Sequence, residues 1–406
     1  MAISSGDRLI SLKTADGKDA VLPVSAVKAE GDRAILLKTA DGYDVPIMCS
    51  AMKTDGQRGT LVQTADGSLV PVVFDVATSH YLMSSSYGVY VFDGTVWTYI
   101  QAQYSKANCA DRLNGRLFFA SYPVYQTGNN AIQYFDTADA SIHSLSGTVG
   151  GMKNIIYALI ADSSGSLYGA GYIYDYDRRG DPINGLGKWN GTSWSSLGSP
   201  TISSYYIKTL AVDSNDNLYA GGSYFSSSII PGLVGDQSVV KWNGTSWSGI
   251  CYQLGYCMSM AVDSNDNLYA GFRTNLGPPT YADVVTVRKY NGGSSWSIVG
   301  TTDAYLNLYD MCFDLDDNLY ICGKFQVVNG VAASNIAKWN GTSWSALGAG
   351  MTEYSQATTI DTDGNVYFGG GNYGGGGDWI KKWDGTDLTD LPDGGINPYC
   401  YSLAYI

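Results

Sequence analysis

The chain carries short runs of alternating apolar and polar residues that are separated by polar turns. Around residues 207–250, the alternating run Ile-Lys-Thr-Leu-Ala-Val predicts a first strand. The polar turn Asp-Ser-Asn-Asp-Asn leads to a second strand, Leu-Tyr-Ala-Gly-Gly, and a variable stretch precedes a third strand, which ends in Lys-Trp. Asn-Gly then favours a tight hairpin turn of the primed type, with positive φ at both residues, into a fourth strand. The unit therefore predicts a four-stranded antiparallel sheet.

The aspartate that opens the first turn recurs along the chain. The aligned residues are Asp111, Asp162, Asp213, Asp263, Asp314 and Asp361, at successive spacings of 51, 51, 50, 51 and 47 residues. A period near fifty residues is typical of repeat architectures, and four strands per repeat predict the blades of an all-β propeller. Large indole rings between neighbouring blades would bury much area. We expect this packing for Trp189, Trp194, Trp242, Trp247, Trp339 and Trp344.

The two ends of the repeat region complete one further copy. Residues 401–406 look like a lone first strand, whereas residues 80–100 supply second, third and fourth strands without a first. Together they predict one blade made from both ends, which closes the ring and removes two exposed sheet edges. Added to six complete copies, this blade predicts a seven-bladed β-propeller over residues 76–406.

The repeat resembles kelch and galactose-oxidase-type propellers over residues 79–406. The resemblance lies in the glycine pair after the second strand, at Gly221-Gly222 and Gly369-Gly370, and in the aromatic pair downstream. The Asp-x-x-x-Asn-Leu-Tyr turn before the second strand departs from the kelch pattern. The resemblance implies a fold and no particular chemistry, because propellers carry many unrelated functions.

Residues 1–75 carry a different repeat, of 25 residues. Each copy predicts a β-hairpin that turns at Ala-Asp-Gly and has a proline on its returning strand, at Pro23, Pro46 and Pro71. Because proline cannot donate to a ladder, we expect these strands at sheet edges. Three hairpins have little core of their own, which favours an anchoring and oligomerising module. A small β-domain packed on the propeller is the alternative.

Composition and charge exclude several classes of function. The 406 residues include 50 glycines and 32 tyrosines, and 37 acidic against 24 basic side chains give a net charge of −13. Nucleic-acid binding normally needs a basic stripe, so we expect no nucleic-acid partner. No apolar run of about 18 residues predicts a membrane span. The start lacks the basic and apolar regions of a signal peptide, so we expect synthesis in a host cytoplasm without one.

Candidate chemistry is sparse. The two histidines lie far apart with no metal-type partners, and the Asp-x-Asn-x-Asn turns lack the following bidentate Glu of a calcium loop, which favours a structural turn. The seven cysteines have no metal-site spacing, which favours buried free thiols. A Cys312–Cys322 or a Cys251–Cys257 bridge stays possible. We therefore predict no catalytic residue, no metal ligand and no cofactor.

The loops at the two ends of the ring differ in character. The first-to-second and third-to-fourth turns barely change between blades, whereas the second-to-third and fourth-to-first loops vary freely. The variable loops share one end of the ring, the variable-loop end, where we expect recognition. Tyrosines with polar neighbours provide rigid contact area at low entropic cost. The candidate ligand-binding residues are Tyr174, Tyr176, Arg178, Arg179, Tyr205, Tyr206, Tyr224, Tyr252, Tyr305 and Tyr373.

These features favour an adhesin attached to a virion or an extracellular particle, whose propeller binds a cell-surface glycan or protein. A Lys-poor, Tyr- and Gly-rich propeller without a secretion signal resembles phage virion components such as tail or head fibres. Residues 1–75 would bind capsid or tail proteins, and we expect a homo-oligomer. One alternative is a polysaccharide-degrading enzyme that uses carboxylates such as Asp175, Asp177 and Asp181, which would need two carboxyl groups at a defined separation. The other is a purely structural capsid or tail decoration protein.

Overall fold

The computed structural model of the protein divides into two compact units, Met1–Thr78 and Ser79–Ile406. In the first unit the described residues are those of the strands given below, and they are described by their backbone alone. In the second unit the described residues, some of them by backbone alone, are 81–85, 89–92, 97–101, 105–111, 115–121, 132–136, 141–145, 155–172, 186–197, 207–225, 233–252, 254–275, 283–303, 307–371, 380–391 and 400–405.

The first unit contains a hairpin in each copy of its 25-residue repeat. β1 pairs with β2, β3 with β4, and β6 with β7. β1–β4 form a four-stranded sheet, and β5–β7 form a three-stranded sheet. The strands are β1 (Arg8–Lys13), β2 (Asp19–Ser25), β3 (Ala34–Lys38), β4 (Asp44–Met48), β5 (Met52–Thr54), β6 (Gln57–Gln63) and β7 (Leu69–Val73).

The prolines of this unit do not all lie on edge strands. Pro46 in β4 and Pro71 in β7 do, whereas Pro23 lies in β2, which has β1 on one side and β3 on the other. Pro23 is opposite Leu9 of β1, and the ladder from β2 to β3 begins one residue later, at Val24. The edge prediction was therefore wrong for β2, which tolerates a proline because the second ladder starts after it.

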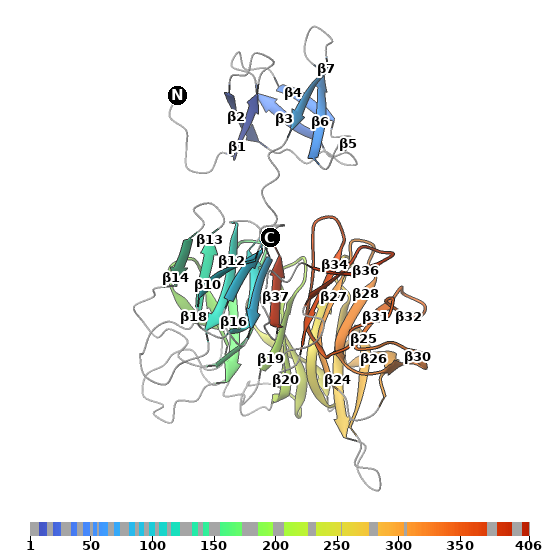
Figure 1. Ribbon diagram of the computed structural model, residues 1–406. Coiled ribbons are helices and arrows are strands. Elements are labelled where there is room, and N and C mark those ends of the chain that lie inside the picture. The colour runs from blue at the N-terminus through green and yellow to red at the C-terminus, as the bar shows by residue number, and fades with distance from the viewer. Residues whose placement is uncertain are drawn as a thin grey trace. The chain divides into compact units, whose positions relative to one another are not determined.

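The second unit is a seven-bladed β-propeller made of four-stranded antiparallel sheets (Figure 1). We number the blades 1–7 in ring order and letter the strands of each blade a to d from the centre outward. The a strands contact one another around a closed ring, in the order β11, β15, β19, β23, β27, β33, β37 and back to β11. The all-β fold and the blade count that the repeat predicts are confirmed.

The strand bounds follow the repeat from blade to blade. The a strands are β37 (Cys400–Tyr405) in blade 1, then β11 (Ser105–Asp111), β15 (Ile155–Ala161), β19 (Ile207–Val212), β23 (Tyr256–Val262), β27 (Asn307–Phe313) and β33 (Ser355–Ile360). The b strands are β8 (Tyr81–Ser85), β12 (Arg116–Ser121), β16 (Leu167–Tyr172), β20 (Leu218–Phe225), β24 (Leu268–Asn275), β28 (Leu319–Lys324) and β34 (Val366–Gly370).

The outer strands are shorter in several blades. The c strands are β9 (Val89–Phe92), β13 (Ile132–Asp136), β17 (Leu186–Trp189), β21 (Gln237–Trp242), β25 (Asp283–Gly292), β31 (Ile336–Trp339) and β35 (Ile380–Trp383). The d strands are β10 (Trp97–Gln101), β14 (Ser141–Ser144), β18 (Trp194–Ser196), β22 (Trp247–Tyr252), β26 (Ser295–Thr301), β32 (Trp344–Ala346) and β36 (Leu388–Asp390). Blade 6 adds a small hairpin of β29 (Val327–Val328) and β30 (Val331–Ala332).

Blade 1 combines strands from both ends of the propeller unit, as predicted. β37, drawn in red in Figure 1, pairs with β8, with Leu403 opposite Met83 and Ala404 opposite Leu82. β37 also contacts the a strands on both sides, β11 and β33. This one strand therefore closes the ring.

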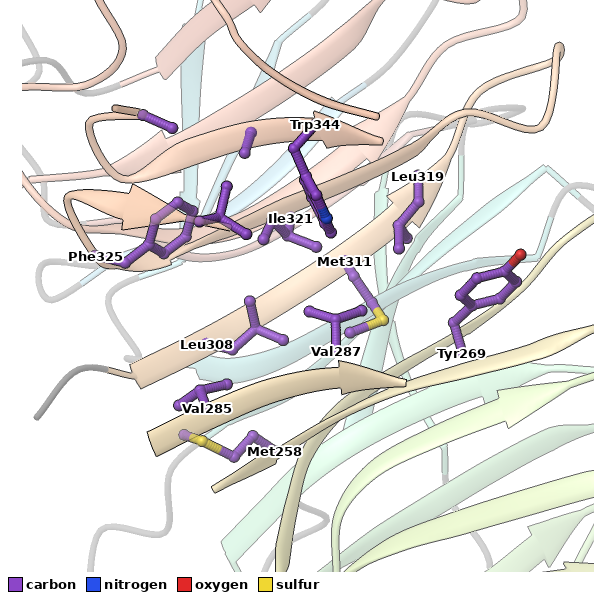
Figure 2. Close-up of a cluster of buried hydrophobic side chains, with 13 residues drawn as sticks. Met258, Tyr269, Val285, Val287, Leu308, Met311, Leu319, Ile321, Phe325 and Trp344 are labelled. Carbon is purple, nitrogen blue, oxygen red and sulfur yellow. The ribbon is translucent and has the colours of Figure 1, made fainter. Parts of the chain in front are cut away.

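Apolar side chains from neighbouring blades share buried clusters. In one cluster, Met258 and Val285 of blade 5 pack with Leu308 and Trp344 of blade 6 (Figure 2). The glycines of strand b make such contacts possible. A Cβ atom on Gly369 would lie 2.3 Å from the Sγ atom of Cys400 in the next blade. The first glycine of the pair is thus explained by the close approach of the next a strand, and the second, Gly370, by the backbone at Tyr354 of its own blade.

The paired tryptophans join successive blades, as predicted. The indole N–H of Trp247 donates to the carbonyl oxygen of Leu197 in the preceding blade at 2.8 Å, and that of Trp344 donates to Val299 at 2.9 Å. Within each hairpin the two tryptophans lie directly opposite each other. These pairs are Trp189 and Trp194, Trp242 and Trp247, and Trp339 and Trp344.

The turn between the paired tryptophans is not the predicted primed turn. Four residues separate Trp189 from Trp194, and Gly191 has a positive φ of 99° whereas Asn190 does not. The Oδ1 atom of Asn190 accepts the N–H groups of Thr192 and Ser193 at 3.0 and 2.9 Å. The prediction failed because asparagine here caps the loop with its side chain instead of adopting a left-handed backbone.

In the described polar turns between strands a and b, the carboxylate of the first aspartate accepts hydrogen bonds from residues of its own turn. The Oδ1 atom of Asp213 accepts the N–H groups of Asn215 and Asn217, and its Oδ2 atom accepts the Tyr219 hydroxyl at 3.0 Å. Burial acts to raise the pKa of Asp213, but these hydrogen bonds outweigh it and lower the pKa. The carboxylate is thus bonded by its own turn.

A second aspartate links the turns of consecutive blades. Asp266, with a φ of 62°, accepts the N–H and the hydroxyl of Ser214 in the preceding blade at 2.8 and 2.7 Å. The same pair recurs at two other joins. Between blades 6 and 7 both positions differ, because Leu315 replaces the serine and Gly364 replaces the aspartate. This join therefore lacks the serine–aspartate hydrogen bonds of the three joins described above.

Candidate functional site in the propeller channel

The predicted ligand-binding residues lie mostly outside the described residues. Tyr252 is described with its side chain, and Tyr224 lies in β20, which is described there by its backbone. The other predicted residues fall outside the described part of the chain: Tyr174, Tyr176, Arg178, Arg179, Tyr205, Tyr206, Tyr305 and Tyr373.

Tyr252 is an exposed aromatic ring at the variable-loop end. It ends β22 and has an exposed fraction of 50%. Its ring packs on Gly235, where an added Cβ atom would lie 2.2 Å from the ring. Buried Gln237 holds the loop that contains Gly235, because its Nε2 group donates to the carbonyl of Val234 at 2.7 Å. Tyr252 is therefore a supported surface ring with one face available.

One loop that we expected to be free for recognition belongs to the core instead. In the 324–335 loop of blade 6, Phe325 and Val328 are buried in the cluster between blades 5 and 6. The carboxylate of Asp303 accepts the N–H groups of Gln326 and Val327, both at 3.1 Å. This loop is variable because it packs on a particular neighbour.

Strand a carries a β-bulge at the same place in each blade. Its ladder to strand b shifts register past one residue, the second or third of the strand. The bulged residues are Lys106, Tyr157, Lys208, Met258, Tyr309, Gln356 and Tyr401. Because strand a begins at the fourth-to-first loop, all seven lie toward the variable-loop end. Bulges often re-aim side chains beside functional sites.

A cavity of about 350 Å³ lies among these bulges. The a strands of blade 1 and of blades 3–7 line it. Its lining includes the bulged residues Tyr157, Lys208, Met258, Tyr309, Gln356 and Tyr401, the polar residues Thr209, Ser259, Asp310 and Ser402, and the apolar residues Ala158, Leu159, Leu210, Met260 and Leu403. Sequence reasoning placed recognition in the loops and missed this cavity.

Asp310 is the carboxylate of the cavity lining. Its Oδ1 atom accepts the N–H of Met311 at 2.9 Å, and its Oδ2 atom accepts the N–H of Thr358 in blade 7 at 3.0 Å. In blade 4 the corresponding residue is Thr209, whose hydroxyl oxygen accepts the N–H of Met260 at 3.1 Å. Asp310 therefore links blades 6 and 7 in the way that Thr209 links blades 4 and 5. Unlike the threonine hydroxyl, its carboxyl group can also titrate.

Among its described residues, the cavity lining carries one acidic and one basic side chain, Asp310 and Lys208. Burial raises the pKa of Asp310 to about 6, against the opposing effects of its hydrogen bonds from Thr358 and Met311 and of the charge of Lys208. The ammonium group of Lys208 lies 5.3 Å from the centre of the Tyr157 ring, within the range of a cation–π contact. Above pH 6 the lining thus presents one described cation and one described anion.

Replacing Asp310 should change how stability depends on pH. A pKa raised from the reference value of 3.8 to about 6 means that the folded state binds more protons than the unfolded state between these values. The wild type therefore loses stability from this group as pH rises through that window. Two units correspond to about 2–3 kcal/mol. In guanidinium unfolding at pH 4 to 7.5, the stability of Asp310→Asn minus that of wild type should increase by about this amount.

Asp310→Thr is the matched control for this effect. It copies Thr209, keeps an acceptor for the Thr358 N–H, and removes the titrating group. Its stability relative to wild type should rise over the same pH window as that of Asp310→Asn. A difference that stays constant with pH in both variants would contradict the raised pKa.

The described cysteines are free thiols. Cys251, Cys257, Cys312, Cys322 and Cys400 form no disulfide, so neither bridge considered from the sequence is present. Burial raises the pKa of Cys251 to about 12, which keeps it protonated at neutral pH. Among the described residues, no group of three or more His, Cys, Asp or Glu side chains is placed to hold a metal ion. The same part of the chain contains no helix with the length and apolar character to cross a membrane.

Comparison with known proteins concerns the fold. No protein-family model and no curated protein sequence matches the chain. A protein from Lactobacillus plantarum is similar in structure with a TM-score of 0.51 at 11% identity, over 81% of this chain and 99% of that one. A gluconolactonase from Xanthomonas campestris has a TM-score of 0.37 at 18% identity, over 78% and 94% of the two chains.

A longer chain is also similar in structure. It is the extracellular domain of a protein from B. thetaiotaomicron described as a one-component system, with a TM-score of 0.42 at 13% identity. The match covers 98% of this chain and 47% of that one, so the chain spans about half the length of that protein. At these identities the likeness concerns the β-propeller fold alone.

Proposed function

We propose that this protein is an adhesin of a phage-type virion or similar particle, whose propeller binds a cell-surface glycan at the variable-loop end. The observation that carries the proposal is Tyr252, half-exposed and supported from below by Gly235. A ring fixed in this way offers contact area to a sugar face without the entropic cost of ordering a loop. A kelch-type origin of the blades agrees with the proposal, because kelch-like propellers carry the fold and leave the loops to determine function.

The first unit, Met1–Thr78, would attach the propeller to capsid or tail proteins and would assemble copies of the chain. Two small sheets of short strands have little interior, which favours burial against a partner or against other copies. Light scattering on the full chain should give a mass above that of one chain. A monomer at micromolar concentration would contradict the oligomerising role.

The adhesin proposal predicts that Tyr252→Ala weakens glycan binding. The full chain should be retained on immobilised bacterial surface polysaccharides without releasing sugar. Tyr252→Ala should lower the affinity about tenfold, which corresponds to about 1.4 kcal/mol. Tyr252→Phe should retain most of the binding, because the ring and its support remain.

The control is Tyr99→Ala in β10 of blade 1. Tyr99 is also 50% exposed, so its removal tests the loss of a surface tyrosine in general. We expect it to bind as wild type does. Equal losses for Tyr99→Ala and Tyr252→Ala would contradict a specific role for Tyr252. Release of sugar would contradict a pure adhesin and favour the polysaccharide-degrading alternative.

A further inference from the structure

The bulged residues differ where the blades are otherwise alike. Residues 211–221 of blade 4 and 261–271 of blade 5 are identical, from the end of strand a through the polar turn into strand b. Three residues before these segments, the bulged position is Lys208 in blade 4 and Met258 in blade 5. Met258 is buried in the cluster between blades 5 and 6, whereas Lys208 is only partly buried, so the bulged position accepts chemically different side chains.

The bulged positions lie on the cavity together with regular residues of strand a. A residue in the regular part of strand a lies opposite a residue of strand b, as Ala211 lies opposite Tyr219. The register of the ladder passes over the bulged residue, and the six bulged residues whose side chains are described all line the cavity. Six blades thus contribute one side chain each to a common space.

The chemistry of the lining fits a neutral, hydroxyl-rich ligand. Phenols at Tyr157, Tyr309 and Tyr401, the amide of Gln356 and the ammonium of Lys208 provide hydrogen-bonding groups around the cavity. Apolar side chains such as Leu210 and Leu403 also line it and suit the C–H face of a sugar ring. A few polar groups in a partly apolar pocket are typical of small-molecule sites.

Size and charge narrow the class of ligand further. A cavity of about 350 Å³ lies at the lower end of the range of about 300–1,000 Å³ found for ligand pockets. Among the described residues, the lining carries one cation, Lys208, and one anion, the carboxylate of Asp310, and the whole chain has a net charge of −13. A phosphorylated ligand or a nucleotide would meet one described cation beside a described anion. A single neutral sugar ring meets balanced charges.

We propose that the channel cavity is a binding site for one neutral, hexose-sized sugar, held by the bulged residues of strand a. The site is separate from the Tyr252 surface, and the inference does not depend on the adhesin function. Lys208, Tyr309 and Gln356 would donate or accept hydrogen bonds with the sugar hydroxyl groups.

The test uses the full chain and three probes, the methyl glycosides of glucose, galactose and N-acetylglucosamine. Saturation-transfer NMR would detect binding, and titration would give the affinity. Lys208→Met places in blade 4 the residue that blade 5 already has at its bulge, so the fold should accept it. Tyr309→Phe removes one hydroxyl and keeps the ring. Each variant should weaken binding of the preferred glycoside about tenfold, the usual scale for losing a hydrogen bond to a charged or buried polar group.

Tyr252→Ala is the control that separates the two sites. It should leave the affinity for the glycoside unchanged while it weakens retention on polysaccharide. The cavity proposal is overturned if none of the three glycosides binds the wild type at millimolar concentration. It is equally overturned if binding survives both cavity variants, or if only Tyr252→Ala removes it, because the sugar would then lie on the surface.

Discussion

A chain that lacks residues 400–406 should lose the cooperative unfolding transition of its propeller. These residues include all of β37, which pairs with β8 and contacts the a strands of both neighbouring blades. The deletion would expose the edge of β8 and remove the buried side chains of Cys400, Leu403 and Tyr405. Burial of such side chains contributes about 1.5–3 kcal/mol each, so the loss approaches the whole stability of a typical domain, about 5–15 kcal/mol.

Differential scanning calorimetry on the purified chains would check this expectation. An extension of several Gly-Ser residues after Ile406 is the control, because it alters the same terminus and leaves β37 intact. The extended chain should unfold at the wild-type temperature, and the shortened chain should show a broad transition or aggregate. A shortened chain with a sharp transition near the wild-type temperature would show that the ring holds without its closing strand.

Trp344→Ala should be among the most destabilising single substitutions in the propeller. Trp344 is 7% exposed, packs with Leu319 and Met311 in the cluster between blades 5 and 6, and lies against Gly300, where an added Cβ would approach its ring within 2.7 Å (Figure 2). Replacing a buried tryptophan by alanine typically costs about 3–5 kcal/mol, because the cavity that remains does not collapse fully.

Trp344→Phe separates packing from hydrogen bonding. It keeps an aromatic ring and removes the N–H that donates to Val299, a loss of about 1–2 kcal/mol. Guanidinium unfolding should therefore rank the wild type above Trp344→Phe, and Trp344→Phe above Trp344→Ala. If the two variants were equally destabilised, the indole N–H would matter more than the area it buries.

The repeat predicted the fold well because the residues that build each blade recur at the same place in every copy. Aspartates at a period near fifty residues fix one polar turn per blade, and the complementary segments at 80–100 and 401–406 predict the closing blade. The packing of the tryptophans between blades followed from their size. The primed turn at Asn190-Gly191 was predicted wrongly, because a dipeptide does not show whether asparagine will use its backbone or its side chain.

The cavity could not be predicted from the same pattern. A bulge shifts the strand register by one residue. In a strand of only six or seven residues, this shift leaves no clear break in the alternation of apolar and polar residues, so the sequence does not reveal it. A signal was present in the comparison of the a strands, where Lys208 and Met258 differ three residues before the identical segments 211–221 and 261–271. Recognising it requires the ladder, which shows that both residues are bulged.

The repeated bulge makes the channel of this propeller a combinatorial surface. Six blades each contribute one described bulged residue to the cavity, while the turns, glycines and tryptophans that build the ring lie elsewhere in the repeat. Duplication of a blade followed by one substitution at its bulge would alter what the channel accepts and leave the architecture intact. A library randomised at Tyr157, Lys208, Tyr309, Gln356 and Tyr401 would therefore vary specificity on a constant scaffold.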